Sequence, residues 1–345
     1  MYTKSKKSAK NDWHKSAARE MSFFSTNQII KGYYNMHKIY KHTFKNALFY
    51  SQDGVMTLIR KKSEMNKLID YYETLDEKYI IKELKKAEEL YKQLKKQLPG
   101  LKLNTKTWSL LARLAEKVWL HYMFGIYFNY ATERKKLDLI KEKNYKLVAR
   151  VRNEINDLQI LDDFLKKYYK KIDLTLLNSK EISKYLASKK LPNQNILLER
   201  KNEYLLAMTN LKTKTIKRQV IQKTLTKYLA SENLANVSEL KGIITYSKKV
   251  AGPAKIVLKK EQLSKIKSGD ILITIMTNPE FIPSLKKVAG IVTDYGGLTC
   301  HASIISREMK IPCIVATKHA TAIFKDGDLI EIDDKKSIVR KLKLA

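Results

Sequence analysis

The 345-residue sequence contains only two cysteines, Cys300 and Cys313. Two cysteines cannot form a disulfide framework, and by themselves they cannot complete a zinc site. The first twelve residues are polar and basic, with none of the apolar stretch that a signal peptide needs. The most apolar run, VWLHYMFGIYF, includes His121 and is too short to span a bilayer. We therefore expect a cytoplasmic protein with no membrane association and no metal site of its own.

Arginine is also scarce. Only 10 of the 68 basic residues are arginine, although the net charge is +33. Direct base reading and bidentate phosphate contacts favour arginine, so nucleic-acid binding is disfavoured without being excluded. We expect most lysines to lie on solvated helix faces. The charge still leaves open the binding of an anionic ligand or an acidic partner.

Glycine and proline are few and unevenly placed. Residues 241–345 hold 7 of the 11 glycines and 4 of the 6 prolines, and both residue types punctuate loops between short elements. The distribution predicts a multidomain chain of α plus α/β class. We expect a disordered basic tail over 1–12, a mainly α-helical region over 13–235, and a domain of short strands and helices over 236–345.

Helical segments are expected in the first region where helix formers dominate or apolar residues recur at helical spacing. These segments lie at 63–97, 108–122, 134–171, 195–209 and 213–230. Two strand-like runs flank Asp53-Gly54, which is a plausible hairpin turn, and they predict a small hairpin near 47–59.

From Leu240 onward, short runs rich in β-branched residues alternate with helix-like segments. The strand-like runs are GIITYS, AKIVL, DILITIMT, GIVTD and CIVA, and the segments EFIPSLKKV and CHASIISREM lie between strands. Strands that alternate with helices predict a mixed or partly parallel sheet with helices packed on it.

The segment GGLTCHASIISREM carries most of the chemistry. A strand ends before Gly296 and Gly297, which permit a tight turn, and a helix then places His301 in its first turn. Unpaired N–H groups and the helix dipole favour an anion there, and the same field disfavours a protonated imidazole. A neutral imidazole is nucleophilic and could accept a phosphoryl group, with Thr299 and Ser303 as nearby hydroxyl donors. Position alone leaves open a structural histidine that caps or packs at a helix start.

These residues resemble the mobile phosphohistidine, or swivelling, domain of the phosphoenolpyruvate-utilising enzymes, which include phosphoenolpyruvate synthase, pyruvate phosphate dikinase and rifampicin phosphotransferase. The run GDILITIMTNPEFIPSLKKVAGIVTD and the closing KDGDLIEIDDKKSIV are similar to the same family, so the resemblance covers about residues 240–342. A cysteine before the histidine is most similar to the synthase branch. The matching motif residues are Gly296, Gly297, Thr299, Cys300, His301, Ala302, Arg307, Glu308, Ile311 and Pro312.

The resemblance implies a β/β/α swivelling domain in which His301 is transiently phosphorylated. It implies phosphate-stabilising or supporting roles for Gly296, Gly297, Thr299, Cys300, Ser303 and Arg307. Thr299 is similar to a threonine that is a target of regulatory phosphorylation in the dikinases. Cys300 is expected to pack or to form hydrogen bonds, not to act as a nucleophile. Arg307 is expected either to hold phosphate or to pair on the helix surface.

Full-length members of the family carry an ATP-grasp domain, and the synthases also carry a barrel that binds phosphoenolpyruvate. The sequence shows no glycine-rich nucleotide loop and no counterpart of the barrel. The resemblance therefore implies a phosphotransferase component that works with a separate ATP-grasp protein, which would hold ATP and Mg²⁺, with no cofactor bound tightly here. The phosphoryl acceptor could be a small molecule. Two other interpretations also remain open: a non-catalytic regulatory module that binds an anionic partner, and a split or truncated relic of a synthase.

Overall fold

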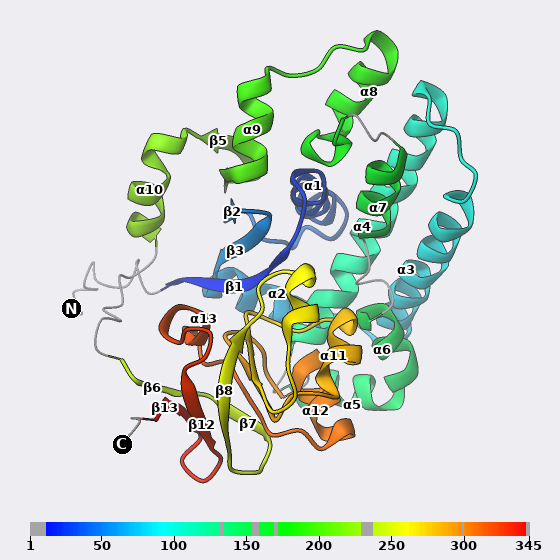
Figure 1. Cartoon of the computed structure of the whole chain (residues 1–345). Helices are drawn as coiled ribbons and strands as arrows, with labels where there is room; N and C mark the ends of the chain where they lie inside the picture. Colours follow the sequence, from blue (N-terminus) through cyan, green and yellow to red (C-terminus); the bar gives the residue numbers. More distant parts are fainter. Residues whose placement is uncertain are drawn as a thin grey trace, which may run out of the picture. The chain divides into compact units, whose positions relative to one another are not determined.

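The computed structural model describes residues 12–131, 134–153, 159–168, 172–228, 237–298 and 300–342. They form two compact units, the first comprising 12–14 and 21–228 and the second comprising 15–20 and 237–342. Both units combine helices with a β-sheet, so the predicted mixture of helices and sheets is confirmed (Figure 1). Apart from Asp12, the predicted basic tail lies outside the described residues.

Helices make up most of the first unit. They are α1 (Phe23–Tyr40), α2 (Lys62–Thr74), α3 (Glu77–Gln97), α4 (Thr105–Tyr130), α5 (Lys135–Lys143), α6 (Tyr145–Asn153), α7 (Gln159–Tyr168), α8 (Ser179–Ser188), α9 (Gln194–Asn202) and α10 (Ile221–Tyr228), with the 3-10 turns η3 (Leu174–Leu176) and η4 (Arg218–Val220). Side-chain caps fix where the two longest helices begin, because Asp76 accepts from the Tyr79 N–H at 2.7 Å and Asn104 accepts from the Thr107 N–H at 2.9 Å.

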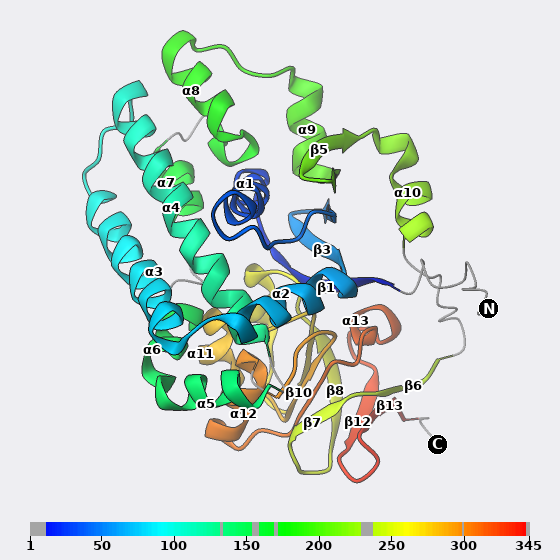
Figure 2. The same ribbon diagram turned by 180° about the vertical axis from the view of Figure 1, so that it is seen from behind.

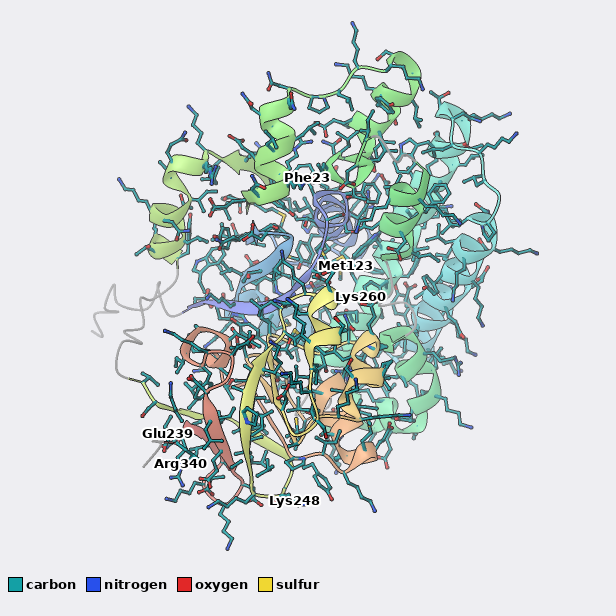
Figure 3. All side chains as sticks on the ribbon, viewed as in Figure 1. Phe23, Met123, Glu239, Lys248, Lys260 and Arg340 are labelled. Carbon is teal, nitrogen blue, oxygen red and sulfur yellow. The ribbon has the colours of Figure 1, made fainter. Side chains whose placement is uncertain are left out.

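The long helices α3 and α4 lie side by side (Figure 2). Both helices bury apolar side chains at helical spacing, including Ile80, Leu84 and Ala87 of α3 and Leu111 and Ala115 of α4. The opposite face of α3 is polar, and long side chains with nitrogen tips stand out from the outer helices (Figure 3).

Four strands complete the first unit and pair in the order β3-β2-β4-β5. They are β2 (Ala47–Gln52), β3 (Val55–Lys61), β4 (Glu203–Thr209) and β5 (Lys212–Ile216). The strand β1 (Trp13–Glu20) belongs to this unit only as far as His14. The hairpin of β2 and β3 turns at Asp53 and Gly54, which have φ angles of 50° and 82°.

The helices predicted over 195–209 and 213–230 are wrong in part. The first ends at Asn202, where the chain continues as β4, and the second is replaced by β5 as far as Ile216. Residues 203–208 of β4 pair with β2 in the antiparallel direction, and β4 buries five consecutive residues. A turn with positive φ at Asn210 and Leu211 joins β4 to β5. β4 forms because pairing with β2 outweighs the local preference of helix formers such as Leu205 and Leu206, and β5 then pairs with β4.

A buried carboxylate connects α7 to the start of α1. Asp162 is 3% exposed, and its Oδ1 atom accepts hydrogen bonds from the Ser22 and Ser25 hydroxyls at 2.8 and 3.0 Å. Burial raises the pKa of the Asp162 carboxyl to about 6, although both serine hydroxyls oppose the shift. An ionised Asp162 therefore lowers the stability of the fold at neutral pH.

The second unit contains an eight-stranded sheet in the order β6-β13-β12-β8-β9-β10-β11-β7. The strands β8, β9, β10 and β11 are parallel neighbours, and the other pairs are antiparallel. The strands are β6 (Glu239–Lys241), β7 (Ile243–Tyr246), β8 (Val250–Ile256), β9 (Ile271–Thr274), β10 (Gly290–Thr293), β11 (Cys313–Val315), β12 (Leu329–Asp333) and β13 (Ile338–Lys341). The helical elements are η5 (Lys260–Lys265), η6 (Pro279–Phe281), α11 (Ile282–Leu285), α12 (His301–Met309) and α13 (Ala320–Ile323).

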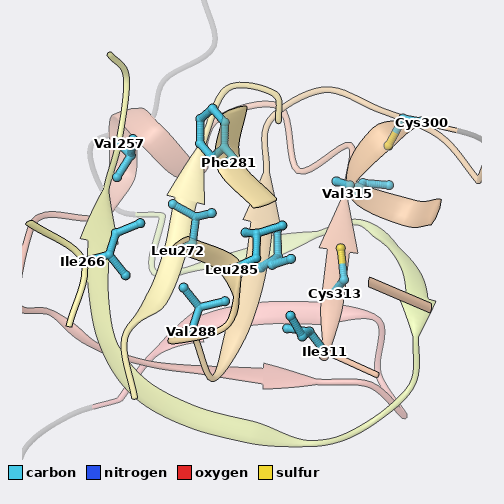
Figure 4. Packing of buried hydrophobic residues seen from close by; sticks show 12 residues of the cluster. Val257, Ile266, Leu272, Phe281, Leu285, Val288, Cys300, Ile311, Cys313 and Val315 are labelled. Atoms are coloured by element: carbon cyan, nitrogen blue, oxygen red, sulfur yellow. The ribbon is translucent and has the colours of Figure 1, made fainter. Parts of the chain in front are cut away.

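Apolar side chains cover both faces of the parallel strands. On one face Leu272, Ile291 and Cys313 pack with Phe281 and Leu285 (Figure 4). The other face packs against a second cluster, which includes Ile273, Val292 and Ile314. Strands that are buried on both faces are typical of parallel sheets that hold their loops rigidly, and this rigidity positions the residues at the strand ends.

Candidate functional site

The loops that follow β9 and β10 meet at one edge of the sheet, because the carboxyl ends of parallel strands lie together. Backbone hydrogen bonds extend the pairing past the strands, from the Asp294 N–H to the Thr274 carbonyl at 3.1 Å and from the Tyr295 N–H to the Ile275 carbonyl at 3.0 Å. The segment before Thr277 and the loop before His301 are therefore held side by side.

Gly296 has a φ angle of 145°, which side chains rarely tolerate. A Cβ atom at Gly296 would also lie 2.8 Å from the Cys300 Sγ atom and 3.3 Å from the Val315 Cβ atom. Gly297 differs, since a Cβ atom there would have no neighbour within 4 Å. Of the two predicted glycines, only Gly296 is required by the turn itself.

The helix α12 begins at His301, in the first turn as the sequence predicts. Cys300 is the N-cap residue, but its side chain makes no capping hydrogen bond. The Cys300 Sγ atom instead lies 3.1 Å from the Ser303 Oγ atom. The N-cap side chain therefore does not compete with an anion for the first N–H groups of the helix, which have no acceptor within it.

Thr277 contacts the His301 ring, and the Thr277 Oγ1 and His301 Nδ1 atoms are 2.9 Å apart. The threonine is 9% exposed and follows β9, and the next residue, Asn278, caps the short turn η6 through the Glu280 N–H at 2.9 Å. Thr277 was not among the predicted site residues. The signal was nevertheless available in the Thr-x-Pro sequence of residues 277–279, which lies in the run that resembles the family.

The hydroxyl of Ser303 supports the loop. Ser303 is fully buried, and its Oγ atom donates to the Gly297 carbonyl at 2.7 Å. The Cys300 N–H donates to the same carbonyl at 3.0 Å. Arg307 acts on the next residue, since its Nη1 atom donates to the Leu298 carbonyl at 3.1 Å. Cys300, Ser303 and Arg307 thus hold the glycine loop together.

Thr299 lies outside the described residues. The other predicted residues of the site are all brought together around the start of α12.

Asp294, which was not among the predicted site residues, anchors the beginning of the loop. This carboxylate is 4% exposed, and it accepts hydrogen bonds from the Thr321 N–H at 3.1 Å and from the Thr321 hydroxyl. Burial raises the pKa of the Asp294 carboxyl, although the Thr321 hydrogen bonds oppose the shift.

In the core, burial raises the pKa of the Cys313 thiol to about 12. Cys313 is therefore protonated and unreactive in the folded protein.

No cluster of three or more histidine, cysteine, aspartate or glutamate side chains with the arrangement of a metal site occurs among the described residues. No helix in the described part of the chain combines the length and apolar character that crossing a bilayer requires.

The comparison with known families agrees with this geometry. Residues 266–336 match the family described as PEP-utilising enzyme, mobile domain. The matched mobile domain includes Thr277, the glycine pair and His301. The resemblance predicted from the residues is confirmed for this part of the chain.

Relatives of the mobile domain are phosphoenolpyruvate synthases. The probable phosphoenolpyruvate synthase of Archaeoglobus fulgidus is 45% identical over 100 residues, which cover 29% of this chain and 13% of that protein. The corresponding probable enzyme of Methanothermobacter thermautotrophicus is 46% identical over 89 residues, or 26% of this chain and 13% of that protein. The enzyme of Pyrococcus furiosus is 46% identical over 91 residues, or 26% of this chain and 11% of that protein. The chain thus spans 11–13% of the length of these relatives.

Proposed function

We propose that this protein is a phosphoryl carrier in which His301 accepts a phosphoryl group and passes it on. The observation that carries the proposal is the position of His301 at the start of α12, with its Nδ1 atom 2.9 Å from the Thr277 hydroxyl. The match of residues 266–336 to the mobile domain supports it, as do the synthase relatives. We also propose that the second unit has the β/β/α arrangement of a swivelling domain.

The Nε2 atom is the proposed acceptor. Transfer to Nε2 retains the contact of Nδ1 with Thr277, whereas transfer to Nδ1 would break it. With Nδ1–H donating to the threonine oxygen, Nε2 carries the lone pair and attacks the phosphorus. The bond from phosphorus to the leaving oxygen breaks, and its electron pair leaves with the donor. The N–H groups at the start of α12 then stabilise the charge of phosphohistidine.

The proposed donor is a nucleotide phosphate held with Mg²⁺ by an ATP-grasp protein. Phosphoryl transfer depends mainly on positioning and charge stabilisation, which a carrier histidine on a rigid sheet edge provides.

The test is intact-mass analysis of the protein from its own cells, with acid and base treatment. An acid-labile, base-stable adduct of about 80 Da on His301 is expected, and it should be absent from His301→Ala. Equal labelling of the parent and the variant would show that another residue is the acceptor. An absence of adduct, even after incubation with ATP, phosphoenolpyruvate and cell extract, would favour a regulatory module that binds an anionic partner.

A further inference from the structure

The loop that presents His301 also presents an exposed leucine, which the chemistry at the imidazole does not use. Leu298 lies three residues before His301, and its side chain is 59% exposed. The other large exposed apolar side chains in the described part of the second unit, Ile243 and Leu258, are 41% and 37% exposed. A single exposed leucine is common on protein surfaces, so its setting decides what it means.

Hydrogen bonds fix the backbone on both sides of the Leu298 side chain. The Gly297 carbonyl accepts from the Cys300 N–H at 3.0 Å and from the Ser303 hydroxyl at 2.7 Å. The Leu298 carbonyl accepts from the Arg307 Nη1 atom at 3.1 Å. The leucine is therefore presented by a loop that is already ordered, which lowers the entropy lost when the loop binds another surface.

The two loops beside the imidazole carry almost no charge. Residues 275–279 and 294–301, which backbone hydrogen bonds hold side by side, contain one charged residue, Asp294, although 30% of the chain is charged. Asp294 is 4% exposed and accepts hydrogen bonds from Thr321, so its charge is buried. This depletion distinguishes the surface around the histidine from the lysine-rich remainder of the protein.

Apolar side chains take the place of charges in these loops. Ile275, Met276 and Tyr295 are half-buried, and together with the exposed Leu298 we call them the neutral rim. The centres of protein–protein interfaces are likewise depleted of charge and enriched in methionine and tyrosine. The neutral rim therefore has the composition of a surface that loses its water on binding a protein.

Two cationic residues border the neutral rim. Arg307 donates to the Leu298 carbonyl, and the N–H of the exposed Lys318 donates to the Asp294 carbonyl at 2.9 Å. Positive charge suits the phosphate that the histidine receives. It gives no reason for an exposed leucine, which requires an apolar surface on the partner.

We propose that Leu298 anchors the docking of the second unit on its phosphoryl donor, and that the donor protein offers an apolar pocket beside its bound phosphate. The inference rests on the proposed carrier function and extends it by naming the surface that the donor presents. Burial of the neutral rim removes water from around His301, which strengthens the electrostatic interactions of the transfer and protects phosphohistidine from hydrolysis. Leu298 makes and breaks no bond, so it determines which protein binds.

The experiment compares two phosphoryl donors on the full chain. Potassium phosphoramidate is a small donor that needs no docking surface, whereas ATP with an extract of the protein's own cells supplies a protein donor. Adduct formation is followed by intact mass below saturating carrier concentration, where the rate reports kcat/KM. Leu298→Ala should react with phosphoramidate within about twofold of the parent rate, but at least about tenfold more slowly with ATP and extract, equivalent to about 1.4 kcal/mol.

Three further variants separate an apolar anchor from other roles. Leu298→Met keeps an apolar side chain of similar size and should react like the parent with both donors. Leu298→Lys places a charge in the proposed pocket and should be slower than Leu298→Ala with ATP and extract. Leu258→Ala makes the same truncation at another exposed leucine of the second unit and should change neither rate.

Several results would overturn the inference. With ATP and extract, Leu298→Ala could match the parent, Leu258→Ala could be slowed equally, or Leu298→Lys could react faster than the parent, which would indicate an acidic donor surface. Slowing of Leu298→Ala with both donors would make the leucine a structural part of the loop. Labelling of His301 by phosphoramidate alone would show that no protein donor docks there, whereas labelling by neither donor would refute the carrier function itself.

Discussion

Replacing Thr277 by valine tests the proposed chemistry at one atom. Valine keeps the shape of the threonine side chain and removes the hydroxyl that contacts the His301 Nδ1 atom at 2.9 Å. Loss of a partner from a partly buried polar group costs about 1–3 kcal/mol. If about 1–2 kcal/mol of this free energy holds the His301 ring in the orientation that transfer requires, its loss raises the activation barrier by that amount and slows phosphorylation by about 5- to 30-fold.

The assay needs no partner protein. Potassium phosphoramidate, a small phosphoryl donor, is mixed with the parent or with Thr277→Val, and adduct formation is followed by intact mass. Phosphorus NMR then distinguishes phosphate on Nε2 from phosphate on Nδ1. The parent is expected to carry it on Nε2, and the variant should be slower and less selective between the two nitrogens.

Thr317→Val is the matched control. Its hydroxyl is also buried and donates to the Thr293 carbonyl at 3.0 Å, without a described contact to His301. Both variants should lose similar stability by urea unfolding, but only Thr277→Val should react slowly. Equal rates in the parent and both valine variants, or phosphate on Nδ1 of the parent, would refute the reasoning about the tautomer.

Further substitutions test the loop, the cysteines and the buried carboxylate. Gly296→Ala should lower the free energy of unfolding by about 1–3 kcal/mol, because of the φ angle and the close neighbours of Gly296. In the same urea titration, Gly297→Ala should unfold with a free energy within about 0.5 kcal/mol of the parent. Equal losses in the two variants would contradict this account of the turn. Cys300→Ser should form the adduct at a rate within about twofold of the parent, since serine preserves the hydrogen bond, and Cys313 should resist iodoacetamide at pH 8 until the protein is unfolded. The folded-state pKa of Asp162 lies above its unfolded value of 3.8, so its unfavourable effect is present above pH 6 and disappears as the pH falls from about 6 to 4. Asp162→Asn should therefore be more stable than the parent at pH 7, by up to about 3 kcal/mol, and the difference should shrink by pH 4.5; a constant difference would exclude this titration.

The sequence predicted much of the second unit because its elements are short and locally marked. Apolar β-branched runs identified its parallel strands, and the glycine pair followed by a helix placed His301 in the first turn of α12. Thr277 was not predicted as a site residue, because it lies 24 residues before His301 in the chain and the two meet only through the pairing of β9 with β10. Local sequence does not encode such a pairing, and only the Thr-x-Pro resemblance could have indicated it.

The sheet of the first unit shows the opposite case. Leu205 pairs with Tyr50 across a separation that no local pattern spans, and the segment around it consists largely of residues that also favour helices. Periodicity therefore predicted a helix where long-range pairing makes a strand. The hydrogen bonds of Tyr40 and His121 to Glu83 were missed for the same reason, because each of the three residues comes from a different helix.

The neighbouring pairing of β9 and β10 has a consequence for experiments on folding. His301 and Thr277 follow different strands, and they meet only when Ile291 lies opposite Leu272 and Val292 opposite Ile273. A shift of one residue in either strand would turn its side chains to the other face and separate the two groups. Rapid and position-selective labelling of the imidazole would therefore report that the central strands have assembled in register. A refolding time course sampled with short pulses of phosphoramidate would therefore measure the rate at which these strands pair in register.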